Sequence, residues 1–314
     1  MFNFNPKAFI DDVSKYIRGI IASSDEVLAA CSGGIDSTVS AVLVSRAIGE
    51  PIKAVYIDDG LRRIGEAEST VKLLRNIGLD PFVYDAREDS LKSLKGITDP
   101  EEKRKAFREF FYNTLGRIAG EVNARYVVQG TIAADIVETV RGVKTQHNVL
   151  EQLGINTYSR YGFKVVEPIK DLYKWQVRMV AQELQLPVEV INRKPFPGPG
   201  LAVRIVGEVT WGKLEILRRV TGIVEEETAD VDSFQSFAVL LDSKATGVRD
   251  GSRVYGFITV VRIVSSSDAL TAKFVEIPYS KLRRIAERIT SEVPEVTRVL
   301  YDITDKPPAT IEFE

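Results

Sequence analysis

The sequence has few residues that form disulfides or bind soft metals, and it has no long apolar run that could cross a membrane. Its 314 residues include one cysteine, Cys31, and one histidine, His147. A single cysteine cannot form an internal disulfide, and these two residues cannot build a thiolate or multi-histidine metal site. No apolar run approaches the roughly 20 residues of a membrane helix, and the N-terminal residues lack the features of a secretory signal. We therefore expect a cytoplasmic protein without a membrane partner.

A net charge of one sign is also missing. Lys and Arg total 42 and Asp and Glu total 44, which gives a formal net charge of −2. Neither half of the chain, divided near residue 192, carries the basic excess typical of nucleic-acid-binding proteins, so we expect no nucleic-acid partner. The 44% of hydrophobic residues is ordinary for a folded protein. Its chemistry must then rest on carboxylates, lysine, arginine, hydroxyl and backbone groups, with or without Mg²⁺.

Short apolar runs alternate with helical patterns through the first 192 residues. This alternation predicts an α/β fold with a parallel sheet covered by helices on both faces. The expected strands are residues 27–31, 52–57, 81–84 and 126–128, with 164–166 as an edge strand. The expected helices are residues 6–22, 36–48, 65–76, 100–122 and 171–185.

Residues 195–200, PFPGPG, interrupt this pattern because three prolines remove backbone donors and fix φ. We place a domain boundary just before them, which gives domains of residues 1–192 and 193–314. The second domain is expected to be small and of the α+β class. Its expected helices are residues 211–228 and 278–292. Its expected strands are residues 236–241, 254–264, 299–303 and 310–313.

The sharpest local signal is the hexad SGGIDS at residues 32–37, between the first expected strand and the helix after it. Glycines allow a close approach to a ligand, and the free amides of a helix N-terminus favour an anion. The Ser32 and Ser37 hydroxyls can donate to the same anion, and Asp36 can hold a Mg²⁺ that bridges phosphates. A capped helix after a glycine turn is the alternative. Cys31, just before the hexad, is expected to be a buried apolar residue.

The hexad lacks the lysine of a Walker loop and the pattern of a dinucleotide fold. It resembles the PP-loop of the ATP pyrophosphatases, which bind the pyrophosphate end of ATP and cleave between its α and β phosphates. Longer stretches resemble the GMP synthetase family within that group: residues 193–205, RKPFPGPGLAVRI, and 302–314, DITDKPPATIEFE. Shorter matches are residues 58–61, 129–132 and 135–138, in the same order along nearly the whole chain.

The resemblance implies an enzyme that uses ATP to adenylate O2 of xanthosine 5′-monophosphate (XMP), after which ammonia displaces AMP to give GMP. It implies a PP-loop domain followed by a dimerisation domain that also binds XMP. The residues it assigns to ATP are Ser32, Gly33, Gly34, Asp36, Ser37, Asp58 and Gly60, with Asp36 also holding the metal. Those it assigns to catalysis are Asp36, Asp135, Glu138 and Lys144. Those it assigns to XMP are Arg104, Gly198, Gly200, Arg298, Lys306, Ile311 and Glu312.

A polar segment at about 135–160 resembles the mobile lid of the family and includes His147 and Asn148. A solvated surface loop is the alternative. The family pattern is broken by Gln146 and by Leu150-Glu151, where a histidine and a glycine pair are usual, and by Lys194, where a histidine is usual. These departures leave open a nucleotide-binding paralogue with weakened catalysis.

Other family members usually carry a glutaminase domain with a catalytic cysteine and histidine, which this chain does not contain. The resemblance therefore implies the synthetase subunit of a two-subunit enzyme, a homodimer that takes ammonia from a separate glutamine amidotransferase subunit. NAD synthetase, a tRNA thiolase or a lysidine synthetase are the alternatives within the PP-loop enzymes. Thiolases generally need more cysteines, and tRNA enzymes usually need a basic face.

Overall fold

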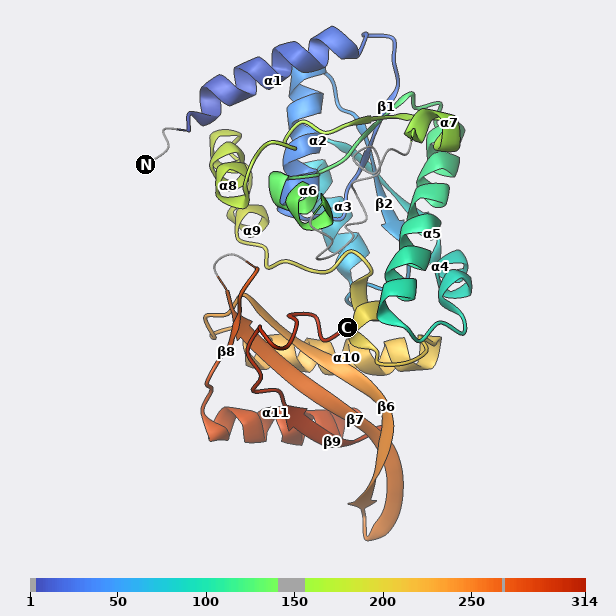
Figure 1. Cartoon of the computed structure of the whole chain (residues 1–314), viewed down its shortest axis with the longest axis vertical. Helices are drawn as coiled ribbons and strands as arrows, with labels where there is room; N and C mark the ends of the chain where they lie inside the picture. The colour runs from blue at the N-terminus through green and yellow to red at the C-terminus, as the bar shows by residue number, and fades with distance from the viewer. Residues whose placement is uncertain (1–3, 141–155, 267–268) are drawn as a thin grey trace. The chain divides into compact units, whose positions relative to one another are not determined.

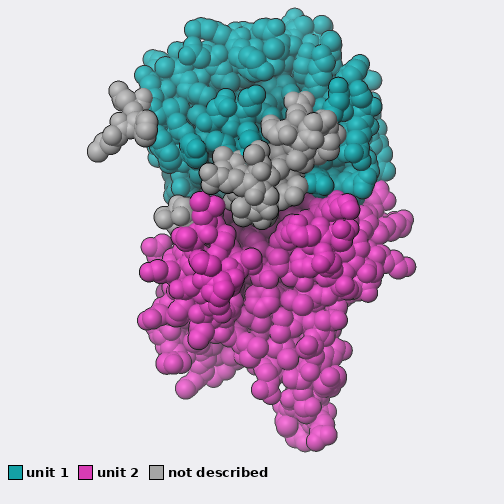
Figure 2. Space-filling view, viewed as in Figure 1, with its two compact units in different colours: residues 1–58, 65–86, 108–193 teal, residues 59–64, 87–107, 194–314 magenta. Residues whose placement is uncertain are grey.

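The computed structural model of the chain describes residues 4–140, 156–266 and 269–314, except for the side chains of residues 137–140 (Figure 1). Within that part of the chain, no helix is both long enough and apolar enough to cross a membrane. The chain divides into two compact units, which Figure 2 colours separately. The first comprises residues 1–58, 65–86 and 108–193, and the second comprises residues 59–64, 87–107 and 194–314.

The main division falls between Arg193 and Lys194, one residue from the expected boundary. Residues 59–64 and 87–107 nevertheless belong to the second unit, although the sequence prediction assigns them to the first domain. The division even falls within one helix, α5 (Pro100–Glu121). A single boundary along the sequence cannot describe a unit that also includes two segments from the first half of the chain.

The first unit is built on a five-stranded parallel sheet, which confirms the predicted α/β fold. Its strand order is β3-β2-β1-β4-β5, so the chain extends the sheet from β1 first to one side and then to the other. In such sheets ligands bind beyond the carboxyl ends of the strands at the point where the order reverses, here at β1 and β4. The strands are β1 (Val27–Ala30), β2 (Lys53–Asp58), β3 (Asp80–Asp85), β4 (Tyr126–Val128) and β5 (Lys164–Val166).

Apolar residues hold this sheet between helices. Val27, Leu28 and Ala29 of β1 are buried, and the helix after it is buried on most of its surface. The core cluster joins these elements to buried residues of the first and eighth helices. The helices are α1 (Pro6–Ile20), α2 (Ile35–Ile48), α3 (Glu66–Asn76), α6 (Ala133–Val140), α7 (Thr157–Tyr161), α8 (Lys174–Glu183), α9 (Val188–Ile191) and part of α5.

The second unit has a four-stranded mixed sheet with helices, as expected for an α+β domain. β6 and β7 form an antiparallel hairpin, β8 pairs with β7 antiparallel, and β9 pairs with β7 in parallel. Helix α10 packs against β6, and α11 packs against β9. The elements are α4 (Arg87–Leu94), η2 (Gly200–Arg204), α10 (Trp211–Glu227), β6 (Gln235–Arg249), β7 (Ser252–Ser265), β8 (Lys273–Phe274), α11 (Tyr279–Glu292) and β9 (Val296–Tyr301), with the first turns of α5.

Two sequence predictions for this unit are wrong. The strands expected at 236–241 and 254–264 are longer, because residues 242–253 between them extend β6 and β7 into one long hairpin that turns at Asp250 and Gly251, both with positive φ. Residues 310–313 form no strand. The backbone carbonyls of Thr310 and Ile311 accept hydrogen bonds from the Arg262 guanidinium, at 2.7 and 3.0 Å, instead of from a neighbouring strand.

Candidate active site

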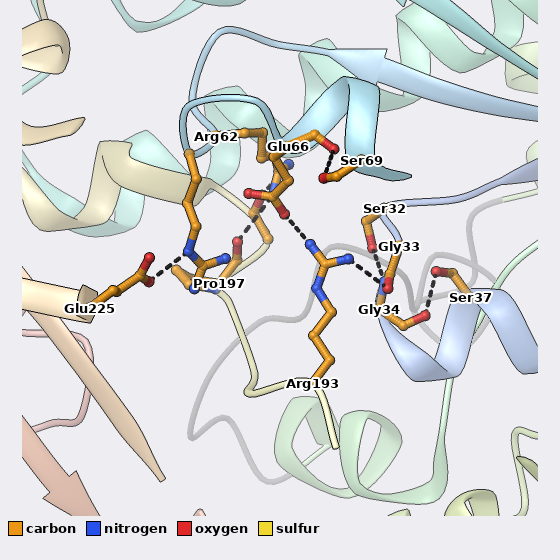
Figure 3. A network of polar contacts seen from close by, with 12 residues as sticks. Ser32, Gly33, Gly34, Ser37, Arg62, Glu66, Ser69, Arg193, Pro197 and Glu225 are labelled. Carbon is orange, nitrogen blue, oxygen red and sulfur yellow. Dashed lines mark hydrogen bonds and ion pairs between the residues drawn. The ribbon is translucent and has the colours of Figure 1, made fainter. Parts of the chain in front are cut away.

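The loop after β1 presents backbone donors at the carboxyl end of the central strand. Gly33 has a φ of +74°, and Gly34, the N-cap of α2, forms no side-chain capping bond. The first amide groups of α2 are therefore oriented for an anion. Ser32 is exposed with its Oγ 3.5 Å from the Gly34 nitrogen, and the Ser37 hydroxyl donates to the Gly34 carbonyl at 3.2 Å (Figure 3). The structure thus brings these four predicted residues together.

Asp36 lies in the first turn of α2 with its two carboxylate oxygens in different surroundings. Oδ2 accepts a hydrogen bond from Lys174 Nζ at 2.5 Å, and Lys174 is the first residue of α8. Oδ1 is buried and has no hydrogen-bond partner in the described part of the chain. A shielded, unpaired carboxylate oxygen is costly, and it is the type of ligand that Mg²⁺ takes.

A Mg²⁺ at Asp36 would have few protein ligands among the described residues. Among the described residues, no group of three His, Cys, Asp or Glu side chains is arranged to hold a metal. Mg²⁺ is commonly bound by one or two carboxylates, with phosphate oxygens and water completing its shell. The single orphaned oxygen of Asp36 fits that mode of binding.

The segment after β4 packs directly against the first turn of α2. A Cβ added to Gly130 would lie 2.5 Å from the Ser37 nitrogen and 2.6 Å from the Asp36 carbonyl carbon. No Cβ tolerates such distances, so glycine is required here for the two loops to meet. In the sequence, this segment is marked only by its resemblance to a family signature, which predicts no role for Gly130.

Buried polar side chains surround Gly130. Thr131 donates to Glu167 Oε1 at 2.5 Å, and Tyr112 donates to the Gln129 side-chain carbonyl at 3.1 Å. Burial raises the pKa of Tyr112 above its ordinary value, so its hydroxyl stays protonated and remains a donor. Glu167 follows β5 and was missed by sequence reasoning, although its position after an expected strand was a usable signal.

The remaining residues predicted for ATP and catalysis divide between described and undescribed parts. Asp58 ends β2 in the first unit, and Asp135 Oδ2 accepts from the backbone nitrogen of Ile132 at 3.0 Å at the start of α6. Glu138 belongs to α6, but its side chain lies outside the described residues. Lys144, His147, Asn148, Gln146, Leu150 and Glu151 lie outside them entirely.

Gly60 belongs to the second unit, and its carbonyl accepts a hydrogen bond from Arg218 there. The neighbouring Asp59 is almost fully buried and forms an ion pair with Arg62 at 2.6 Å. Asp59 also accepts from the Leu61 nitrogen at 2.9 Å. The second aspartate of the segment therefore anchors a turn of the second unit.

All seven residues predicted for XMP belong to the second unit. Glu312 is buried, and its two carboxylate oxygens accept from Arg204 Nε at 3.0 Å and from Gln235 Nε2 at 2.8 Å. Ile311 beside it is buried too. Lys306 donates to the Ala269 carbonyl at 2.9 Å.

The other XMP residues lie on different elements of this unit. Arg298 is exposed on β9, and Arg104, near the start of α5, donates to the backbone oxygen of Glu314. The Gly198 carbonyl accepts from Arg62 at 2.8 Å, and Gly200, with a φ of +59°, packs so closely on the Leu61 carbonyl that no Cβ fits. The described contacts thus tie Arg104 to the C-terminal tail of residues 302–314, which includes Glu312, whereas none of them ties Arg298 to it.

Sequence reasoning missed three buried cations that hold the C-terminal tail. Arg204 lies between the rings of Phe237 and Phe196, 4.0 and 4.9 Å from their centroids, and burial lowers its pKa. Lys103 is fully buried and donates to the Ile205 carbonyl at 2.6 Å and to Glu314 at 2.5 Å. The third is Arg262. Arg204 lies inside the stretch 193–205 that resembles the GMP synthetase family, and Lys103 precedes Arg104, so a signal for both was available.

The chain resembles known proteins over its whole length. The family model for the GMP synthase C-terminal domain matches residues 222–313, and the model for NAD synthase matches residues 8–230. A subunit of the glutamine-hydrolyzing GMP synthase from Methanocaldococcus jannaschii is 50% identical over 99% of this chain and 100% of its own length. The equivalent GMP synthase subunit from Methanopyrus kandleri is 49% identical over 99% of this chain and 100% of its own length. That from Archaeoglobus fulgidus is 50% identical over 98% of this chain and 98% of its own length.

Proposed function

This chain belongs to the family of ATP pyrophosphatase subunits of glutamine-hydrolyzing GMP synthase, and we propose that it catalyses the ATP-dependent amination of XMP to GMP. The observation that carries the proposal is the loop of residues 32–37, which combines oriented amides with the orphaned carboxylate oxygen of Asp36. Such a site suits the pyrophosphate end of ATP with its metal ion. Full-length similarity to these GMP synthase subunits favours XMP over the acceptors of other PP-loop enzymes.

The reaction proceeds in two displacements. In the first, O2 of XMP attacks the α-phosphorus of ATP, the bond to the β-phosphate oxygen breaks, and pyrophosphate leaves. In the second, ammonia attacks C2 of the adenylated base, the bond from C2 to oxygen breaks, and AMP leaves with that oxygen while a proton is lost. Adenylation is needed because an oxygen on C2 is a poor leaving group. Both steps depend mainly on positioning and on compensating charge.

The protein's own groups have distinct roles in this account. The amides and hydroxyls of residues 32–37 bind the pyrophosphate, and Asp36 holds Mg²⁺, which supplies positive charge at the phosphates. Lys174, beside Asp36, adds a cation at the same place. Asp58 and Gly60 contribute to binding ATP, and Asp135, Glu138 and Lys144 to catalysis, with His147 and Asn148 in a lid over about residues 135–160.

XMP is held by residues of the second unit in this account. They are Arg104, Gly198, Gly200, Arg298, Lys306, Ile311 and Glu312. Support comes from the C-terminal tail, because its residues are fixed by buried cations and do not fray as a chain end usually does. The buried pairing of Glu312 with Arg204 and Gln235 holds the tail motif in a single conformation.

Ammonia comes from a separate glutamine amidotransferase subunit, as the name of the relatives implies for them. The proposal includes a homodimer formed through the second domain, a cytoplasmic location and no nucleic-acid partner. It follows that free ammonium replaces the partner in a purified assay, whereas glutamine supports the reaction only when the amidotransferase subunit is added.

The test is to incubate the purified chain with ATP, Mg²⁺, XMP and ammonium and to identify all nucleotide products. We expect GMP, AMP and pyrophosphate in equal amounts, with no product when XMP is left out. Formation of ADP and phosphate would contradict the proposal. Binding of ATP and XMP without turnover, even with the amidotransferase subunit and glutamine present, would instead identify a paralogue that has lost catalysis.

A further inference from the structure

Arg193 contacts the back of the anion-binding loop, and neither the sequence motifs nor the comparisons give it a role. Its Nη1 donates to the carbonyl of Gly33 at 2.8 Å, and its Nη2 forms an ion pair with Glu66 (Figure 3). Glu66 is buried, with 7% of its side chain exposed, and lies in the first turn of α3, where the helix dipole favours an acidic residue. Both ends of the guanidinium are therefore held.

The contact to Gly33 determines where the next amide points. In a trans peptide the carbonyl oxygen and the following N–H point in opposite directions. Because Arg193 holds the Gly33 oxygen on its own side, the Gly34 N–H must point away from Arg193, where it donates a long hydrogen bond of 3.5 Å to the Oγ of exposed Ser32. Since Ser32 is exposed, an anion that reaches this side can accept from the Gly34 N–H in place of Ser32 Oγ, and from the Ser32 hydroxyl as well.

The same peptide would be easy to turn without such a contact. It joins two glycines, and glycine adopts both signs of φ at little cost, so rotation of the whole peptide plane meets little resistance. A charge-assisted bond from a guanidinium to a carbonyl is stronger than a neutral one. The packing is close as well, since a Cβ on Gly33 would meet Arg193 Nη1 and would lie 2.7 Å from Thr70 Oγ1.

The backbone of Arg193 is itself fixed. It directly follows α9 and its C-cap Asn192, and the Arg193 nitrogen lies 3.4 Å from the Val190 carbonyl, to which it donates. The guanidinium thus starts from a rigid position in the same compact unit as the loop.

We infer that Arg193 is a positioning residue for ATP: it fixes the Gly33–Gly34 peptide so that the Gly34 N–H faces the pyrophosphate, and Glu66 holds Arg193 in place. The inference rests on the proposed use of this loop for ATP. It predicts that loss of Arg193 weakens binding of ATP selectively, because the loop then spends less time with its amide toward the ligand. Binding of XMP does not depend on that peptide.

The decisive experiment compares Arg193→Met, Arg193→Lys and Glu66→Gln with the control Arg46→Met. Arg46 is matched because its guanidinium also donates to a backbone carbonyl of the first unit, that of Leu184, at 2.7 Å, but from the far end of α2. Steady-state assays give the KM for ATP and for XMP, and calorimetric titration with ATP alone gives its affinity without turnover.

We expect Arg193→Met to raise the KM and Kd for ATP about tenfold or more, the usual loss for a charge-assisted bond, and to leave the KM for XMP within about twofold. Arg193→Lys should recover part of the affinity, since one ammonium can reach one of the two acceptors. Glu66→Gln should weaken ATP binding about threefold, and Arg46→Met should change neither constant by more than about twofold. Glu66→Gln decides the question if Arg193→Met does not fold.

Equal values of KM and Kd for ATP in Arg193→Met and Arg46→Met would overturn the inference. A parallel rise in the KM values for ATP and XMP in Arg193→Met would overturn it too. Failure of the proposed function gives a different result. If the wild-type chain forms no GMP but binds ATP, and Arg193→Met weakens that binding, the positioning role stands and the substrate assignment falls. If wild type forms GMP and Arg193→Met has the same KM for ATP as wild type, the substrate assignment stands and the positioning role of Arg193 falls.

Discussion

The loop of residues 32–37 and the C-terminal tail of residues 302–314 are both assigned to nucleotide substrates, but they are built in opposite ways. The loop offers mainly backbone groups, exposed hydroxyls and one partly buried carboxylate. The tail is held by long side chains that are themselves buried, chiefly Lys103, Arg204 and Arg262. The loop resembles a preformed anion site, whereas the tail is an irregular segment fixed by charge.

This difference separates function from stability. Exposed or half-exposed charged groups contribute little to the free energy of unfolding because water screens them. A buried charge that loses its partner is strongly destabilising. Substitutions in the loop should therefore reduce activity and leave the fold intact, while substitutions among the tail's ion pairs should reduce both.

The largest effect is expected for Asp36→Ala, which removes the only carboxylate of the loop. We predict that kcat falls by about 10³-fold or more, because charge compensation at the phosphates is lost. The free energy of unfolding should fall by less than about 1 kcal/mol, because Lys174 and Asp36 are 40% and 26% exposed in their pair and the orphaned Asp36 Oδ1 is itself a cost to the folded state. Steady-state assays and urea unfolding measure the two effects.

Asp12→Ala is the matched control, since it removes a carboxylate from an exposed pair with Lys15 on α1. It should alter neither quantity. An Asp36→Ala enzyme with activity within about tenfold of wild type would remove Asp36 from the catalytic account. A large loss of stability would show that the loop is not the purely functional element described above.

The second largest effect is expected for Glu312→Ala in the tail, and it is a loss of stability. Glu312→Ala leaves the fully buried Arg204 without its carboxylate, so we predict a loss of about 3–5 kcal/mol in the free energy of unfolding. The double variant Arg204→Met/Glu312→Ala should be more stable than Glu312→Ala alone, because it removes the unpaired charge as well. Urea midpoints at constant m-value report both changes.

The control for this prediction is Glu295→Ala, which breaks an exposed pair with Arg219 and should cost about 0–1 kcal/mol. If Glu312→Ala costs no more than this control, the tail is not held by buried charge. If the double variant is no more stable than Glu312→Ala, the loss comes from packing and not from the unpaired guanidinium.

The smallest effect tests the strand that carries the loop. Cys31 is 2% exposed, and burial raises the pKa of its thiol from 9.0 to about 12, so it is not a nucleophile, as the sequence predicts. Since the folded pKa is the higher one, this contribution to stability is complete below pH 9 and is lost as pH rises toward 12. Relative to Cys31→Ala, wild type should lose about 1.4 kcal/mol of stability per pH unit in that window.

Urea unfolding of both proteins at pH 8, 9.5 and 10.5 gives this difference directly. The comparison cancels the other groups that titrate in the same range. A difference that stays constant across the three pH values would mean that the thiol is accessible to water, and the interior just behind the loop would then not be dry.

Local patterns were sufficient to predict the strands of the first unit and the position of the loop after the first of them. The alternation of apolar strands with helices indicated the parallel sheet, and the hexad after residue 31 indicated an anion site at its carboxyl edge. Such signals are contained in short windows, because the strand period and the helix N-terminus are local properties. Helix α4 was missed, since Arg87–Leu94 is largely polar and shows only a weak apolar face.

Long-range pairing could not be predicted in the same way. Arg193 and Glu66 are 127 positions apart, and Arg204 and Glu312 are 108 apart. No periodicity marks such partners, and charged residues usually lie on the surface. Residues 310–313 of the tail were expected to form a strand, but the carbonyls of Thr310 and Ile311 are taken by the Arg262 guanidinium.

The most direct test of the central claim follows one oxygen atom. XMP labelled with ¹⁸O at O2 is incubated with the protein, ATP, Mg²⁺ and ammonium, and the nucleotide products are analysed by mass spectrometry. The account predicts that AMP carries one ¹⁸O and that GMP and pyrophosphate carry none. AMP without the label, or label in inorganic phosphate, would contradict adenylation of XMP at O2.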